Sequence, residues 1–232
     1  DVVTTNIDST LATKTYSFRA KSSSGSQNPV FDHGAQSIGA FYLNAFGNDK
    51  PLLWLNGGWY RYFEDTTKGQ DGLWHHWLLL SHTDVTQSRL FCDGVELAAA
   101  STVTTSSGAH PYTTGIKIGR TDAYGTFNGS LDEFAIFDGD QTDIQEDKDF
   151  RRRLYNDGQP TKLTVLKPAN IATDYLDHWY RMGEGKLGTK SDGDSNLLFD
   201  KGPNGLMGSE LVTNGTFDAD SDWSHTSTKQ TR

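Results

Sequence analysis

This sequence lacks the residues that disulfide bonds, membrane spans and nucleic-acid contacts require. One cysteine, Cys92, stands in 232 residues, so no intrachain disulfide can form and packing must stabilise the fold. No apolar run approaches the roughly 18 residues of a membrane-spanning helix, so we expect no membrane insertion. Lys and Arg number 21 against 30 Asp and Glu, which gives a formal net charge of -9 and leaves no basic stripe for phosphates. We therefore expect a soluble chain that binds no nucleic acid.

Turn residues are what the sequence has in quantity. It contains 24 Gly, and short segments of alternating polarity lie between turn signals, a pattern typical of an all-β protein. Thr142 and Gln145 have capping-box spacing and predict one late helix, which ends at Asn156–Gly158. Residues 98–108, rich in Ser, Thr and Ala, are expected to form a loop. The predicted strands span 14–21, 30–32, 38–46, 52–55, 59–63, 73–81, 90–92, 116–119 and 131–137. This spacing indicates a two-sheet β-sandwich.

The segment 73–81 is apolar at both alternating sets of positions, which predicts a central strand that is covered on both faces. The two sets are Leu73, Trp77 and Leu79, and Trp74, Leu78 and Leu80.

Two longer motifs carry a family resemblance. Residues 72–94 read GLWHHWLLLSHTDVTQSRLFCDG, and residues 128–139 read NGSLDEFAIFDG. Their order and spacing resemble the laminin-G-like, concanavalin A-like jelly-roll domains. The resemblance implies an antiparallel jelly-roll sandwich with a short C-terminal helix for residues 1–163. A connector with a short helix and Gly/Asp-rich strands is expected at 164–209. Residues 210–232 resemble the start of a further β-sandwich module, which is incomplete.

Catalytic chemistry finds little support in the pattern. Glycoside hydrolases on this fold need two carboxylates on one strand face. Asp132 and Glu133 are adjacent, so we expect them on opposite faces of a strand, and we predict no enzyme activity. His75 and His76 are adjacent too, and a structural role is expected for both instead of a shared metal ion. Cys92 lies within a strand and is expected to be buried and inert.

Aromatic residues are the best binding candidates. Residues 59–63 put Tyr60 and Tyr62 on one strand face and Trp59 and Arg61 on the other, and one of these faces must be core. The other face could stack sugar rings, with Arg61 bonding hydroxyls or a carboxylate. Tyr124 could join from a loop at the rim. The alternative is that these rings pack against a neighbouring strand or subunit.

A structural calcium ion is the one cofactor that the family resemblance brings in. Related domains hold Ca²⁺ at the sandwich rim with Asp, Asn and carbonyl oxygens, as suits a hard cation. Residues 191–196, SDGDSN, are the closest match to such a loop, and a solvated turn is the alternative. We assign no ligands.

Three functional hypotheses follow. The motifs TKTYSFRAKSS (13–23), VFDHG (30–34) and LDHWYRMG (176–183) resemble virion structural proteins of marine tailed bacteriophages. That resemblance implies a non-enzymatic virion surface protein, a capsid decoration or tail-fibre component. Its adhesion domain would bind host glycans or neighbouring virion proteins, and it would form homo-oligomers. The second hypothesis is a secreted bacterial adhesin or the carbohydrate-binding module of a polysaccharide-degrading enzyme. The third, an enzyme within this chain, lacks its carboxylate pair.

Overall fold

The structure is a computed structural model. It describes residues 3–4, 14–33, 39–45, 49–55, 59–64, 67–82, 84–104, 116–121, 124–138, 148–159, 163 and 176–181. The capping residues Thr142 and Gln145, residues 182–209 of the connector, the calcium-loop candidate at 191–196 and the module start at 210–232 all lie outside these ranges.

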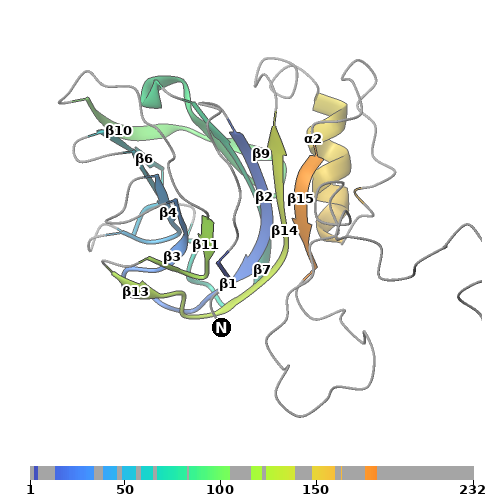
Figure 1. Cartoon of the computed structure of the whole chain (residues 1–232), viewed down its shortest axis with the longest axis horizontal. Helices are drawn as coiled ribbons and strands as arrows, with labels where there is room; N and C mark the ends of the chain where they lie inside the picture. The colour runs from blue at the N-terminus through green and yellow to red at the C-terminus, as the bar shows by residue number, and fades with distance from the viewer. Residues whose placement is uncertain are drawn as a thin grey trace, which may run out of the picture.

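Two antiparallel sheets face each other across a core, and the predicted all-β sandwich is confirmed (Figure 1). The seven-stranded sheet has the order β1 (Val3–Thr4), β11 (Ile116–Ile118), β3 (Pro29–His33), β4 (Ala40–Tyr42), β5 (Leu52–Leu55), β6 (Trp59–Phe63) and β10 (Ala99–Thr104). The six-stranded sheet has the order β15 (Leu176–Tyr180), β14 (Ser130–Asp138), β2 (Lys14–Lys21), β7 (Trp74–Ser81), β8 (Arg89–Cys92) and β9 (Val95–Leu97). A small pair, β12 (Arg120–Thr121) and β13 (Gly125–Thr126), completes the strands described.

Aromatic side chains fill the space between the sheets. Tyr16 stacks on Phe31 with ring centroids 4.4 Å apart, and Phe18 stacks on Phe134 at 5.7 Å. These rings and Trp77 of β7 are all at most 1% exposed. Because each fully buried large side chain contributes about 1.5–3 kcal/mol, this cluster holds the sandwich together without a disulfide.

Strand β7 is covered on both faces from Trp77 to Leu80, as its sequence predicts. The prediction is wrong for Leu73, which precedes β7 and is 62% exposed, and for Trp74, which is 46% exposed at the start of the strand. Trp77 and Leu79 point into the core between the sheets, while Leu78 and Leu80 belong to a second cluster on the outer side. The helix α2 (Lys148–Tyr155) lies over that outer side and adds Leu154 to the cluster (Figure 1). The predicted helix end is confirmed, since a 3₁₀ turn, η3 (Asn156–Gly158), follows α2.

The predicted loop at 98–108 is wrong for its first half. Residues 99–104 form β10, which pairs antiparallel with β6 along its length. Ser, Thr and Ala show no clear alternation of polarity, and the strand exists because β6 offers a partner, which the local sequence cannot reveal. As an edge strand, β10 has exposed polar side chains at Ser101 and Thr102.

The prediction that the adjacent acids Asp132 and Glu133 point to opposite faces of a strand is wrong. Glu133 has a φ of 51°, and the register of β14 against β2 shifts between Asp132 and Ala135. This β-bulge inserts a residue and breaks the alternation. Asp132 stands opposite Arg19, and Glu133 lines the same small cavity as Arg19, so both acids lie on the outer side of the six-stranded sheet.

Strand β15 comes from the expected connector, yet it pairs with β14 at the edge of the six-stranded sheet. Trp179 Nε1 donates to Glu133 Oε2 at 2.6 Å, and Arg181 Nε donates to Glu133 Oε1 at 3.1 Å. Residues 176–181 are thus held against the edge of the sandwich. The boundaries at 163, 209 and 210 stay a prediction.

None of the described helices is long and apolar enough to cross a membrane.

Candidate functional site

The outer face of the seven-stranded sheet carries a group of aromatic side chains. In the strand register, Tyr42 stands opposite Leu52 and Leu52 opposite Tyr62, while Trp54 stands opposite Tyr60. Directly opposed residues of neighbouring strands share a sheet face. Pairing across β4, β5 and β6 therefore collects these rings on one surface, away from the core.

Ring geometry joins the loop residue Tyr124 to this group. Its ring centroid lies 6.1 Å from Tyr42 and 6.1 Å from Trp54. Trp54 lies 6.4 Å from Tyr60, and Tyr60 lies 5.6 Å from Tyr62. We call these five residues, Tyr42, Trp54, Tyr60, Tyr62 and Tyr124, the aromatic face.

Exposure differs within the aromatic face. Tyr42 is fully buried and forms its floor, whereas Tyr124 is 37% exposed. Trp54, Tyr60 and Tyr62 are half-buried and pack on the small apolar cluster around Tyr42. These rings are held from below by packing and keep part of their surface exposed. Such a surface suits a ligand that lies on it.

The predicted site residues divide between the two sides of β6. Tyr60, Tyr62 and Tyr124 come together on the outer side, which decides between the two faces of 59–63 that the sequence left open. Arg61 faces the other way and donates to the carbonyl oxygens of Val85, at 3.3 Å, and Thr86. Burial lowers the pKa of its guanidinium. Its hydrogen bonds hold the 3₁₀ turn η2 (Val85–Gln87) against β6. Arg61 therefore does not line the aromatic face.

The side chain of Trp59 lies outside what the structure describes, although its backbone in β6 pairs with Leu55 of β5. Whether any of the five predicted residues binds a ligand stays a prediction.

Two members of the aromatic face, Tyr42 and Trp54, were not among the sequence candidates. Both lie at even positions of predicted strands, in phase with Tyr60 and Tyr62 across the hairpin of β5 and β6. Pairing 52–55 with 59–63 by parity would have found Trp54. Finding Tyr42 requires the β4–β5 pairing, which follows a loop and is not fixed by a tight turn.

The outer side of the six-stranded sheet is closed instead. Leu154 of α2 and Trp179 of β15 form one buried apolar cluster with Leu78 and Leu80 there. Beneath them lies a cavity of about 10 Å³, lined by Ser17, Arg19, His76, Glu133, Leu154 and Leu163. Such a volume has room for about one water molecule.

The polar groups around this cavity are buried. Ser17 Oγ lies 2.9 Å from His76 Nε2, and Arg19 donates to the carbonyl oxygen of Gly158 in η3. Desolvation, with the positive charge of Arg19 nearby, lowers the pKa of His76 to about 3, so the ring is neutral. A serine paired with a neutral histidine resembles a hydrolase dyad. No substrate larger than water fits the cavity, and the pair acts as a polar contact under α2.

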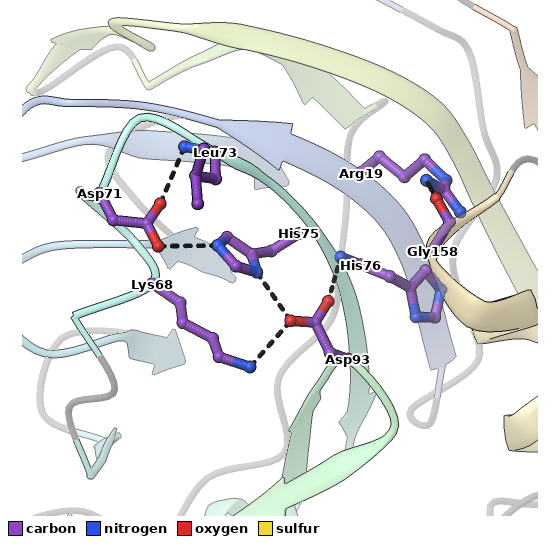
Figure 2. A network of polar contacts seen from close by, with 8 residues as sticks. All are labelled: Arg19, Lys68, Asp71, Leu73, His75, His76, Asp93 and Gly158. Carbon is purple, nitrogen blue, oxygen red and sulfur yellow. Dashed lines mark hydrogen bonds and ion pairs between the residues drawn. The ribbon is translucent and has the colours of Figure 1, made fainter.

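A second polar network fixes the rim between β7 and the β8–β9 turn (Figure 2). Asp93 accepts from Lys68 Nζ at 2.8 Å, from His75 Nδ1 at 2.7 Å and from the backbone N–H of His76 at 3.0 Å. His75 Nε2 also lies 3.0 Å from Asp71 Oδ2. His75 and His76 thus point to opposite sides and have structural partners, as predicted.

This rim holds the one group of potential metal ligands found among the described residues. Ligand atoms of His75, Cys92 and Asp93 lie within 4.8 Å of one another. Calcium prefers oxygen ligands, and here two of the three are nitrogen and sulfur. The ammonium of Lys68 already bonds the Asp93 carboxylate, and burial raises the pKa of the Cys92 thiol. The residues do not fit Ca²⁺, and a calcium site elsewhere stays a prediction.

Comparison with protein families places this fold. Residues 1–145 match a laminin-G family model of the concanavalin A-like lectin/glucanases superfamily. The chain belongs to this family. The match of the laminin-G-like domain covers all five residues of the aromatic face and the rim network, whereas α2 and β15 lie beyond residue 145.

Solved structures share the laminin-G-like fold at low sequence identity. A candidate carbohydrate-binding protein from Bacteroides ovatus aligns with a TM-score of 0.56 at 12% identity, over 86% of this chain and 52% of its own. The present chain thus spans about half the length of that protein. Domain 4 of the extracellular arabinanase AbnA from Geobacillus stearothermophilus, in complex with arabinotriose, aligns at 17% identity with a TM-score of 0.40, over 55% of this chain and 61% of its own. No curated protein matches the chain.

Proposed function

We propose that this chain is a non-enzymatic glycan-binding module whose binding surface is the aromatic face. One observation carries the proposal: four partly exposed aromatic side chains, from β5, β6 and a loop, gather over the buried Tyr42 on the outer side of the seven-stranded sheet. Aromatic rings stack on the CH-rich faces of sugars, and phenol hydroxyls can bond sugar hydroxyls. The rings are already held in place by packing, so binding would cost little conformational entropy.

The arrangement of the rest of the molecule supports this choice of surface. The outer side of the six-stranded sheet is closed by a buried apolar cluster to which α2 contributes Leu154, whereas Trp54, Tyr60 and Tyr62 on the outer side of the seven-stranded sheet are only half-buried. The superfamily includes lectins, and the Bacteroides ovatus protein of similar fold is itself a candidate carbohydrate binder.

The absence of catalysis is part of the proposal. Asp132 and Glu133 lie on one side of the sheet, but Glu133 is 7% exposed and its carboxylate is bonded to Trp179 and Arg181. Burial raises the pKa of Glu133 above the usual range despite these bonds. A carboxyl group held in this way has no access to a glycosidic bond.

The setting in which the module works remains a proposal based on sequence resemblance. A module of a secreted adhesin or of a polysaccharide-degrading protein accords best with the similarity to carbohydrate-binding structures. Display on a phage virion, with other virion proteins and host glycans as partners and as a homo-oligomer, is the alternative that the motifs at 13–23, 30–34 and 176–183 suggest.

A glycan array with matched variants tests the proposal. The double variant Tyr60→Ala, Tyr62→Ala removes two rings of the aromatic face. The control, Trp74→Ala, removes a 46% exposed ring from β7 in the other sheet. We expect the wild type and the control to bind the same glycans, and the double variant to lose them while keeping its circular dichroism spectrum and melting temperature. Equal binding by the double variant and the control would refute the proposal.

A further inference from the structure

We infer that the rim between β7 and the β8–β9 turn binds a Zn²⁺ ion through the side chains of His75, Cys92 and Asp93. These ligands come from the six-stranded sheet, whereas the aromatic face belongs to the seven-stranded sheet. The inference therefore goes beyond the proposed function and does not depend on it. It rests on the positions of the three side chains, on the two carboxylates beside the His75 ring and on the kinds of atom that the site offers.

The strand register brings His75 and Cys92 to the same side of the sheet. Cys92 of β8 stands opposite Trp77, and His75 of β7 stands opposite Ala20. Cys92, Trp77 and Ala20 all belong to the core between the sheets. Directly opposed residues share a sheet face, so His75 also lies on the inner side, at the end of β7 where the core meets the rim.

The Asp93 carboxylate is already oriented toward this point. Its Oδ1 accepts from the backbone N–H of His76 at 3.0 Å, and its Oδ2 lies 2.7 Å from His75 Nδ1. Ligand atoms of His75, Cys92 and Asp93 all lie within 4.8 Å of one another. Tetrahedral zinc, with bonds of about 2.0–2.3 Å, keeps its ligand atoms about 3.3–3.6 Å apart. The present separations lie on both sides of these values, so small side-chain rotations are sufficient to enclose the ion.

The His75 ring lies between two carboxylates (Figure 2). Nε2 is 3.0 Å from Asp71 Oδ2, and Nδ1 is 2.7 Å from Asp93 Oδ2. A neutral imidazole carries one N–H and donates to one carboxylate only, so its other nitrogen presents a lone pair to the second. That second contact requires a cation, which is either another proton on the ring or a metal ion. With Nε2–H donated to Asp71, Nδ1 has the orientation of a zinc ligand that is fixed by an outer carboxylate.

The kinds of ligand atom select the metal. A thiolate sulfur beside an imidazole nitrogen favours Zn²⁺ over Ca²⁺ or Mg²⁺, which prefer oxygen. Burial raises the pKa of the Cys92 thiol in the metal-free protein, and zinc would displace its proton to solvent. The ammonium of Lys68 bonds Asp93 at 2.8 Å, but its side chain is 35% exposed and is able to turn outward. Three protein ligands leave the fourth zinc position to water.

Isothermal titration calorimetry with zinc chloride tests the inference on the whole chain, reduced and stripped of metal with a chelator. We expect one Zn²⁺ per chain and a melting temperature that rises with zinc concentration, because an ion that binds the folded state stabilises it. Titration with Co²⁺ gives a spectroscopic readout. Cys92 is the sole cysteine of the sequence, so a thiolate-to-cobalt charge-transfer band identifies its sulfur as a ligand without any substitution.

Substitutions separate ligands from residues that act through them. His75→Gln and Cys92→Ser each remove a ligand and should weaken zinc binding by at least about 100-fold. Asp71→Asn keeps an acceptor for Nε2–H but loses its charge, and should weaken binding about ten-fold. Lys68→Met removes a competing cation and should tighten binding by roughly three- to ten-fold. Loss of a merely structural contact would not increase zinc affinity.

The matched control is His178→Gln. His178 also lies beside a carboxylate, with its Nε2 3.3 Å from Asp177 Oδ2, but it belongs to β15 and not to the rim. This variant should bind zinc as the wild type does, and circular dichroism should show that every variant is folded. Failure to bind Zn²⁺ at one ion per chain, absence of the cobalt band, or equal zinc affinity in His75→Gln and His178→Gln would each overturn the inference.

Discussion

The outer surfaces of the two sheets arise from the same alternation of side chains, but they differ in how deeply their apolar side chains are buried. On the six-stranded sheet, Leu78 and Leu80 are buried in one apolar cluster with Leu154 and Trp179. On the seven-stranded sheet, Tyr60 and Tyr62 occupy the equivalent outward positions and stay half-exposed. The difference comes from α2 and β15, whose side chains Leu154 and Trp179 join the apolar cluster on the outer side of the six-stranded sheet. An outward apolar row is thus structural or functional according to what the rest of the chain places on it.

The strongest test of this comparison removes one side chain from each surface. Leu78→Ala should lower the free energy of unfolding by about 2–5 kcal/mol, since it leaves a cavity in a closed cluster. Tyr60→Ala should cost less than about 1 kcal/mol, because its ring is partly in solvent already. Guanidinium-induced unfolding measures both.

Glycan affinity should show the reverse order, with Tyr60→Ala weakened and folded Leu78→Ala unchanged. If Tyr60→Ala destabilises the protein as much as Leu78→Ala does, the aromatic face is part of the structural core and the comparison fails.

The sequence predicts the closed surface more completely than the open one. Two apolar sets in 73–81 are sufficient to place β7 at the centre, and Asp93-Gly94 is sufficient to predict the turn, in which both residues have positive φ, 50° and 76°. Such conformations are typical of tight hairpins with Asp-Gly. These features are local, so composition and alternation reveal them.

The open surface depends on contacts between distant segments. Tyr42 joins Tyr124 across more than eighty positions, and Arg61 turns away from the aromatic face because the carbonyl groups of η2 lie on its side of β6. Neither contact can be predicted from the local sequence pattern. The bulge at Glu133 is similar, since its positive φ places two adjacent acids on one side, against the usual alternation.

Lowering the pH should reduce the stability of the protein through His76, beneath the closed surface, and should leave the aromatic face unchanged. Its pKa is about 3 in the folded protein, because burial and Arg19 oppose its charge. Arg19 faces the ring from β2, Glu133 from β14, Tyr155 from α2 and Asp93 from the β8–β9 turn. The unfolded chain takes up this proton near pH 6.5. The contribution to stability is therefore complete above that pH and falls as the pH is lowered, by about 2 kcal/mol at about pH 5.

His33 adds a loss in the same direction, because burial lowers its pKa to about 3 as well. Unfolding free energies measured between pH 7 and pH 5 should fall for the wild type and fall by about half as much for His76→Gln, which keeps a neutral polar side chain. Glycan affinity of the folded protein should change little over this range, since phenol and indole groups do not change charge there. A pH slope unaltered by His76→Gln would show that the cavity under α2 is open to solvent.

A substitution of Arg61 should have the smallest effect on stability. It also tests whether the two sides of β6 have separate roles. Arg61→Met keeps the length of the side chain and removes the bonds to the carbonyl groups of Val85 and Thr86. Because the guanidinium is partly exposed, the loss of stability should be about 1 kcal/mol or less. Amide hydrogen exchange should become faster at residues 85–88, where the turn loses its anchor, and glycan affinity should stay within about two-fold of the wild type. A ten-fold weaker affinity with unchanged exchange would place Arg61 on the binding surface, and β6 would then present both of its faces to the ligand.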